Sequence, residues 1–316
     1  MPFDPMLGEA VEAMRGRLAA APLSSDPVQR ARQIDGYTRP SLEDLERDGA
    51  FAVTERHVPG PAGAADILLV VCIPAAAGRN VPGLFYVHGG GMISGNSRSG
   101  LPEMLDLAAE VGAAVISVEY RLAPEHPHPA PVEDCYAGLR WVAANVEELG
   151  LDPARLIVAG ASAGGGLAAA LALLARDRGG PALAGQLLNC PMLDARNDTP
   201  SAHQMAGVDM WDRAANEIGW SALLGSDRMD ADPYASPSMA TDLSGLPPAF
   251  IDVGSAETFR DEDVAYATAI WRAGGRAELH VWPGGFHGFD TAVPDSPLAR
   301  QARAARVDWL RRVLDG

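Results

Sequence analysis

Short apolar runs alternate with longer helix-like stretches along most of the chain. Eight runs have the length and composition of strands: 50–53, 66–74, 84–87, 113–118, 156–159, 186–190, 248–253 and 277–281. Nearly continuous apolar strands separated by helices are typical of a mostly parallel sheet covered by helices on both faces. The first two runs have no helix between them, so they predict an antiparallel hairpin at one edge of the sheet.

Two segments outside this alternation predict a helical cap. Residues 1–46 place Met6, Val11, Met14 and Leu18 at roughly helical spacing, and prolines punctuate the rest. Residues 197–230, between the sixth and seventh apolar runs, have the composition of an insertion, rich in methionine, tryptophan and polar residues. We therefore expect an α/β domain over residues 47–196 and 231–316, with a lid built from the two helical segments.

Charge and composition exclude several classes of function. The chain has 316 residues and a formal net charge of -16, which argues against a nucleic acid or an anionic membrane surface as partner. All 25 basic residues are arginine. A Schiff-base lysine, a phosphate-binding P-loop lysine and a Ser-x-x-Lys nucleophile pair are therefore excluded.

The cysteines and the N-terminus favour a cytoplasmic protein without a metal. Cys72, Cys135 and Cys190 are scattered, an odd number without C-x-x-C spacing, which supports neither a disulfide framework nor a zinc site. His126 and His128 lack carboxylate or cysteine partners at ligand spacing. The first residues lack a basic stretch followed by an apolar one, and no run approaches the ~18 apolar residues of a membrane span.

The most informative motif is the heptapeptide Gly160-Ala161-Ser162-Ala163-Gly164-Gly165-Gly166 between a strand-like and a helix-like run. This G-x-S-x-G pattern predicts a nucleophile elbow, in which a tight strand-to-helix turn projects the serine hydroxyl outward. The alternative is a glycine-rich turn that is not a catalytic site. A dinucleotide-binding reading is disfavoured, because these glycines follow a serine that already occupies the turn.

A second glycine motif supports acyl-transfer chemistry. His88-Gly89-Gly90-Gly91 directly follows the apolar run 83–87. In an α/β-hydrolase arrangement, backbone N–H groups of such a loop join the N–H of the residue after the nucleophile, here Ala163, to form an oxyanion hole.

A serine nucleophile also needs a base and an acid, which in this arrangement follow it along the chain. His287 lies in a glycine-containing loop beyond the last strand and is favoured over His280, which lies within the strand. Glu257 comes first after the seventh strand and is favoured as the acid. Asp261 is the main alternative, but it lies where the next helix begins, and acids in a first helical turn commonly just compensate the helix dipole.

Several motifs lie in one order along nearly the whole chain. They are His88-Gly89-Gly90-Gly91, Tyr120-Arg121-Leu122-Ala123-Pro124-Glu125 with Pro129-Ala130 and Asp134, the elbow, Arg260-Asp261-Glu262, and His287-Gly288-Phe289. In this set the chain resembles the microbial hormone-sensitive-lipase family of esterases, bacterial lipolytic family IV. Ser255-Ala256-Glu257 is similar to the subgroup with a GTSAG elbow, although Ala161 stands where the family usually has Asp or Thr.

The resemblance implies an α/β-hydrolase fold with a helical cap and a cofactor-free serine carboxylesterase acting on short-chain acyl esters. It implies Ser162 as nucleophile, His287 as base and Glu257 as acid. Gly90, Gly91 and Ala163 are the implied oxyanion donors, with Gly89 as a further candidate. A small-molecule ester is the expected partner, and a homodimer is possible in this family. The alternatives are an amidase or formamidase on the same scaffold, or a non-catalytic ligand-binding relative.

Overall fold

The fold is built on one eight-stranded sheet. The computed structural model describes residues 3–21, 24–36, 39–226 and 228–315. Strand order is β1-β2-β4-β3-β5-β6-β7-β8, and every neighbouring pair is parallel except β1 with β2 and β2 with β4. The strands are β1 (Phe51–Val58), β2 (Ile67–Pro74), β3 (Val81–Val87), β4 (Ala114–Val118), β5 (Leu151–Ala161), β6 (Gly185–Asn189), β7 (Ala249–Gly254) and β8 (Ala277–Trp282).

The predicted α/β-hydrolase sheet, with eight mostly parallel strands and an antiparallel hairpin at one edge, is confirmed. Three strands, β1, β3 and β5, extend well beyond their apolar runs. β1 continues to Val58 through residues 54–57, which are exposed, because an edge strand need not be apolar to form its ladder. β5 begins at Leu151, which pairs with Val81 before the register shifts.

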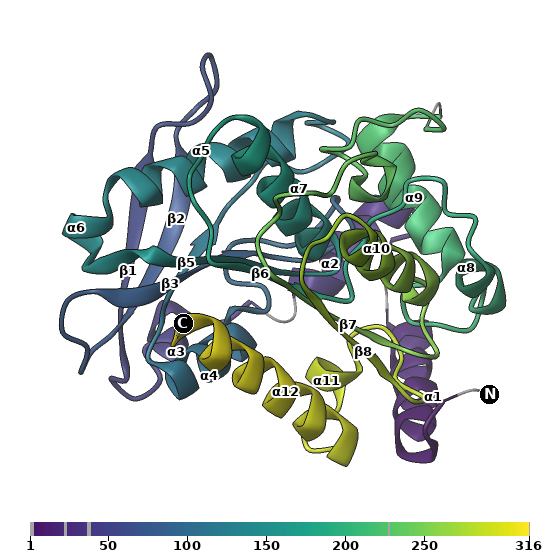
Figure 1. Ribbon diagram of the computed structural model, residues 1–316. Helices are drawn as coiled ribbons and strands as arrows, with labels where there is room; N and C mark the ends of the chain where they lie inside the picture. The colour runs from purple at the N-terminus through teal and green to yellow at the C-terminus, as the bar shows by residue number, and fades with distance from the viewer. Residues whose placement is uncertain (1–2, 22–23, 37–38, 227, 316) are drawn as a thin grey trace.

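Helices cover both faces of the sheet, as Figure 1 shows. One face carries α5 (Ala130–Ala144), α6 (Val146–Leu149), α7 (Ala163–Asp177) and α10 (Arg260–Arg272), and the other carries α3 (Leu42–Leu45), α4 (Leu101–Val111) and α12 (Pro297–Leu314). Alternate side chains of the central strands point to opposite layers. On β3, for example, Phe85 joins the cluster beneath α5 and α7, whereas Leu84 joins the cluster beneath α4 and α12.

The two segments expected to form the cap are helical. The first contains α1 (Pro5–Ala20) and α2 (Pro27–Gly36), and the second contains α8 (Pro200–Gln204) and α9 (Arg213–Leu224). They gather at one end of the sheet in Figure 1. The predicted cap ranges also include residues 1–2, 22–23, 37–38 and 227, which lie outside the described residues. Within the described part of the chain, no helix combines the length and the apolar character that crossing a membrane requires.

Helix α1 is anchored by an apolar cluster that reaches the loop after β8. Leu7 and Val11 are fully buried against Phe286 and Phe289, and Ala299 and Ala302 of α12 complete the cluster. The backbone N–H of Asp4 donates to the carbonyl of Gly284 at 3.0 Å. The N-terminal helix is therefore packed against the segment that contains His287.

A buried ion-pair network fixes α12 to the sheet. Arg306, 5% exposed, donates through Nη2 to Asp252 on β7 at 2.7 Å and to Asn189 on β6 at 3.0 Å. Its Nη1 donates to Asp290 in α11 (Phe289–Ala292). These carboxylates hold the pKa of Arg306 above its usual range against the opposing effect of burial. The Arg306 guanidinium therefore connects α12 to β6, to β7 and to α11, which follows the last strand.

Arg306→Ala should destabilise the fold by about 3–5 kcal/mol, because it leaves the carboxylates of Asp252 and Asp290 buried without their cation. Arg311→Ala on the same helix removes only surface pairs, with Glu110 and Asp308, and should cost about 1 kcal/mol or less. Urea denaturation of both variants measures the difference. Equal losses in the two variants would show that the buried network does not stabilise the fold.

Candidate active site

The serine of the elbow occupies a strained turn between β5 and α7. Ser162 has φ 57° and ψ -122°, a backbone conformation that a non-glycine residue rarely adopts. The turn closes tightly, since a Cβ on Gly160 would lie 2.1 Å from the carbonyl oxygen of Gly164. The Ser162 N–H donates to Asn189 on β6 at 2.8 Å, and its carbonyl accepts from Gly166 at 3.0 Å and Met192 at 2.9 Å. The surrounding backbone therefore holds the strained residue in place.

The glycine loop after β3 lies against this turn. A Cβ on Gly89 would be 3.4 Å from Cβ of Ser162, and Gly90 and Gly91 both have positive φ, 116° and 60°. Tyr120 supports the loop, because its hydroxyl donates to the carbonyl of His88 at 2.9 Å and its ring stacks on the His88 imidazole. The loop expected to supply oxyanion donors is therefore adjacent to the serine, with Ala163 at the first position of α7.

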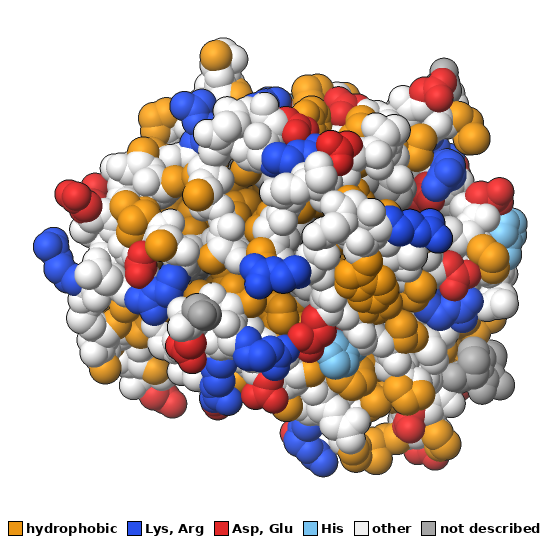
Figure 2. All heavy atoms as spheres, in the orientation of Figure 1, with side chains coloured by type: hydrophobic (Ala, Val, Ile, Leu, Met, Phe, Trp, Pro, Cys, Tyr) orange, Lys and Arg blue, Asp and Glu red, His pale blue; other side chains and the backbone are white. Residues whose placement is uncertain are grey.

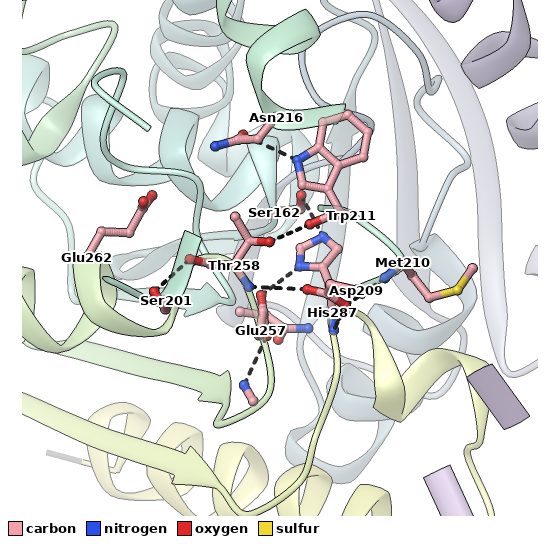
Figure 3. Close-up of polar contacts among 12 residues, drawn as sticks. Ser162, Ser201, Asp209, Met210, Trp211, Asn216, Glu257, Thr258, Glu262 and His287 are labelled. Atoms are coloured by element: carbon pink, nitrogen blue, oxygen red, sulfur yellow. Dashed lines mark hydrogen bonds and ion pairs between the residues drawn. The ribbon is translucent and has the colours of Figure 1, made fainter. Parts of the chain in front are cut away.

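Ser162, His287 and Glu257 form a continuous hydrogen-bonded chain (Figure 3). His287 Nε2 lies 3.0 Å from Ser162 Oγ, and His287 Nδ1 lies 2.6 Å from Glu257 Oε1. The other carboxylate oxygen, Glu257 Oε2, accepts from the backbone N–H of Gly254 at 2.9 Å. An imidazole held between a hydroxyl and a carboxylate can take the hydroxyl proton while the carboxylate stabilises the imidazolium.

The competing residues are engaged elsewhere. His280 lies on β8, where its Nε2 pairs with Glu278 at 2.9 Å and its ring stacks on Trp282. Asp261 accepts from the backbone N–H of Ser201 at 2.8 Å and pairs with Arg260. The structure thus brings Glu257 and His287, and neither alternative, to the serine.

Burial and charge act on His287 in opposite directions. Burial by itself lowers the pKa of the imidazole, but the charge and hydrogen bond of Glu257, with smaller contributions from Asp209 and Asp290, raise this pKa above its ordinary value. The carboxylate partner is 1% exposed, so its influence is little screened by water. The site therefore strengthens the affinity of the imidazole for a proton.

Two residues near the triad were not predicted. Asp209, 78 residues before His287 in the chain, accepts from the backbone N–H of His287 at 3.1 Å. The Trp211 ring lies on the oxyanion loop, because a Cβ on Gly91 would be 2.1 Å from its Cη2 atom. Both belong to the segment 197–230, which the sequence predicts as part of a cap. Nothing in its sequence indicates which of its side chains turn toward the triad.

The site also contains the one group within the described residues whose side chains lie close enough together for a shared metal. Ligand atoms of Cys190, Glu257 and His287 lie within 4.8 Å of one another. However, His287 Nδ1 and Glu257 Oε1 are hydrogen-bonded to each other. Burial also raises the pKa of the Cys190 thiol well above its usual value. A neutral thiol is a poor metal ligand, so these donors suit proton transfer better.

Glu257→Gln should lower the pKa of His287, because it removes the negative charge that most strongly raises it. NMR titration of the imidazole measures the change. Glu278→Gln is the matched control, since Glu278 pairs with His280 and should leave His287 unchanged. An unshifted His287 in Glu257→Gln would contradict the electrostatic coupling.

Comparison with known proteins agrees with this geometry. A family model described as the alpha/beta hydrolase fold matches residues 84–291. The chain is 39% identical to the carboxylesterase NlhH of Mycobacterium tuberculosis over 316 residues, covering 99% of this chain and 96% of that protein. It is 32% identical to the esterase LipI of the same species over 318 residues, again covering 99% and 96%.

Solved structures show the same relationship. A bacterial heroin esterase superposes with a TM-score of 0.87 at 35% identity, covering 99% of this chain and 98% of that one. The family match extends over most of the chain and contains the elbow, the glycine loop, Glu257 and His287. The chain therefore belongs to the α/β-hydrolase family and, within it, to the hormone-sensitive-lipase-like esterases.

Proposed function

We propose that this protein is a serine carboxylesterase that hydrolyses short-chain acyl esters through an acyl-enzyme. The observation that supports this most directly is the hydrogen-bonded chain from Ser162 through His287 to Glu257. The relatives named carboxylesterase and esterase, which this chain matches over nearly its full length, support the same reaction class.

In the first half of the reaction, Ser162 Oγ attacks the ester carbonyl carbon while His287 Nε2 accepts the hydroxyl proton. The imidazolium then returns this proton to the leaving alcohol as the carbon–oxygen bond breaks. In the second half, water attacks the acyl-enzyme by the same route, which releases the carboxylic acid and restores Ser162. Glu257 keeps the Nδ1 proton of the imidazole in place throughout. These steps draw on no cofactor.

Backbone N–H donors stabilise the negative charge that develops on the carbonyl oxygen of the substrate. We assign Gly90, Gly91 and Ala163 to this role, with Gly89 as a further candidate, because the glycine loop lies against the elbow. The positive end of α7, which begins at Ala163, favours the same charge.

An amidase or formamidase would use the same machinery, since a triad does not identify the leaving group. The names of the relatives favour ester hydrolysis. A non-catalytic ligand-binding relative is disfavoured, because the imidazole is oriented at both nitrogens. Parallel assays with matched ester and amide substrates separate these alternatives.

The preference for short acyl chains is supported by Trp211. Its indole covers Gly91 of the oxyanion loop and is held by a bond from Nε1 to the buried Asn216 at 3.2 Å. A large, fixed ring next to the position expected for the substrate carbonyl leaves little room for a long acyl chain.

Other features of the proposal concern the whole protein. We assign residues 1–46, apart from α3 on the sheet, and residues 197–230 to the cap, and residues 47–196 and 231–316 to the catalytic domain. We place the protein in the subgroup with a GTSAG elbow. The net charge of -16 suits a cytoplasmic enzyme without stable membrane association, and the face in Figure 2 shows acidic side chains interspersed with basic ones. A homodimer through β8 is supported by exposed apolar side chains at this edge of the sheet, Val281 of β8 at 39% and Trp271 of the neighbouring α10 at 47% exposed.

Ser162→Ala should abolish hydrolysis of p-nitrophenyl acetate, with a loss of at least about a thousandfold in kcat, because the acyl-enzyme has no oxygen on which to form. Ser221→Ala, an exposed position on α9, is the control and should retain full activity. Initial rates with a p-nitrophenyl series measure both variants. Turnover surviving in Ser162→Ala would overturn the proposed mechanism.

Trp211→Ala should raise kcat/KM for longer acyl chains relative to acetate, by roughly tenfold at the most affected length, because it opens space beside the oxyanion loop. Trp211→Phe retains most of the bulk and should keep the wild-type preference. The same p-nitrophenyl series provides the measurement. An unchanged chain-length profile in Trp211→Ala would place the acyl pocket elsewhere.

A further inference from the structure

A buried carboxylate from the cap bridges the two loops that present the acid and the base. Asp209 lies just before α9 and is only 4% exposed. Its Oδ1 accepts from the backbone N–H of His287 at 3.1 Å, and its Oδ2 accepts from the backbone N–H of Thr258, also at 3.1 Å. Thr258 directly follows Glu257. Figure 3 shows Asp209 next to both Thr258 and His287.

The two bridged loops leave different strands. Glu257 follows β7 and His287 follows β8, so their spacing depends on contacts between the loops rather than on chain connectivity alone. The 2.6 Å bond between His287 Nδ1 and Glu257 Oε1 requires that spacing to be well defined. Since misplacement by about 1 Å can cost a hundredfold in rate, a carboxylate that binds both backbones bears directly on catalysis.

The cap holds Asp209 in this position through contacts on both sides. Arg15 of α1 donates through Nη2 to the carbonyl of Gly207 at 3.1 Å and to the carbonyl of Asp209 at 3.2 Å. The hydroxyl of Thr258 donates to the carbonyl of Trp211 at 2.7 Å. The N-terminal helix, the cap insertion and the acid loop are therefore joined through residues 207–211.

The charge of Asp209 also reaches the imidazole. Burial, with repulsion from Glu257, raises the pKa of Asp209, although the charge of His287 and hydrogen bonds from the backbone oppose this rise. Asp209 in turn raises the pKa of His287. The other titratable or charged groups that act on this cluster are Glu257, Asp290, the Cys190 thiol, Glu262, Asp263 and, through its main-chain contact, Arg15.

From this geometry we infer that Asp209 is a positioning residue for the acyl transfer proposed above, on whose triad assignment the inference rests. Delivered by the cap, its carboxylate aligns the loops of Glu257 and His287 and gives the imidazole a second negative neighbour. The alignment therefore depends on the position of residues 207–211, which the contacts of Arg15 and Thr258 fix.

The test compares three variants by their kcat, KM and pH profile with p-nitrophenyl acetate. Asp209→Ala should lose roughly tenfold to a hundredfold in kcat with little change in KM, because alignment is lost while substrate contacts remain. Asp209→Asn keeps the shape and one acceptor but removes the charge. Its loss in kcat should be smaller, and the acidic limb of kcat/KM should move to lower pH by roughly half a unit or more, since His287 must be neutral to act as base.

Asp212→Asn is the matched control. Asp212 makes the same kind of contact three residues further on, accepting from the backbone N–H groups of Ala215 at 2.9 Å and Gly207 at 2.8 Å. It should leave kcat and the acidic limb within about twofold and a few tenths of a unit of wild type. A limb that does not move in Asp209→Asn, or that moves equally in Asp212→Asn, would overturn the inference.

An NMR titration of His287 separates this inference from the proposed mechanism, because it needs no activity. The imidazole pKa in the Ser162→Ala background should fall when Asp209→Asn is added. An unchanged pKa, with Ser162→Ala inactive, would refute the role of Asp209 alone. Hydrolysis that persists in Ser162→Ala would refute the triad, whereas the titration would still report on the electrostatic contact. If Asp209→Ala fails to fold, the near-isosteric Asp209→Asn still decides the question.

Discussion

The structure depends on the strained backbone at Ser162. A left-handed φ on a residue with a side chain persists only where neighbouring contacts compensate for it. Here the elbow N–H and carbonyl are bonded to β6, to α7 and to Met192, and the approach of Gly164 to β3 leaves no room for a side chain. The small residues around the serine are therefore required by the geometry of the turn, which directs the Ser162 hydroxyl toward His287.

The order of the strands brings the three residues of the triad together. Strands β5, β6, β7 and β8 are consecutive neighbours and parallel, so the loops after them meet at one edge. The serine follows β5, the acid follows β7 and the base follows β8. Arg306 of α12 donates hydrogen bonds to Asn189 and Asp252 on the intervening strands β6 and β7. The charge of the buried Asp252 carboxylate is therefore balanced by an arginine of the helix that packs against the sheet.

Sequence reasoning identified what depends on local pattern. The apolar runs located all eight strands, and small residues in fixed order pointed to Ser162 and to the loop of Gly89, Gly90 and Gly91. The full length of β1 was missed because its exposed residues carry no apolar signal. Asp209 was also missed, since its role arises only when a cap residue meets a loop 78 positions later in the chain. Long-range backbone contacts of this kind leave no trace in local sequence.

The packing of α1 has a consequence for how the protein loses activity. Leu7 and Val11 of α1 cover Phe286 and Phe289, which flank the loop of His287, while Arg15 holds the 207–209 segment. A helix on the outside of a domain can detach at a lower free energy than global unfolding requires. Mild denaturant or limited proteolysis would thus inactivate molecules whose sheet is intact, so spectroscopic melting curves overstate the working range of the enzyme.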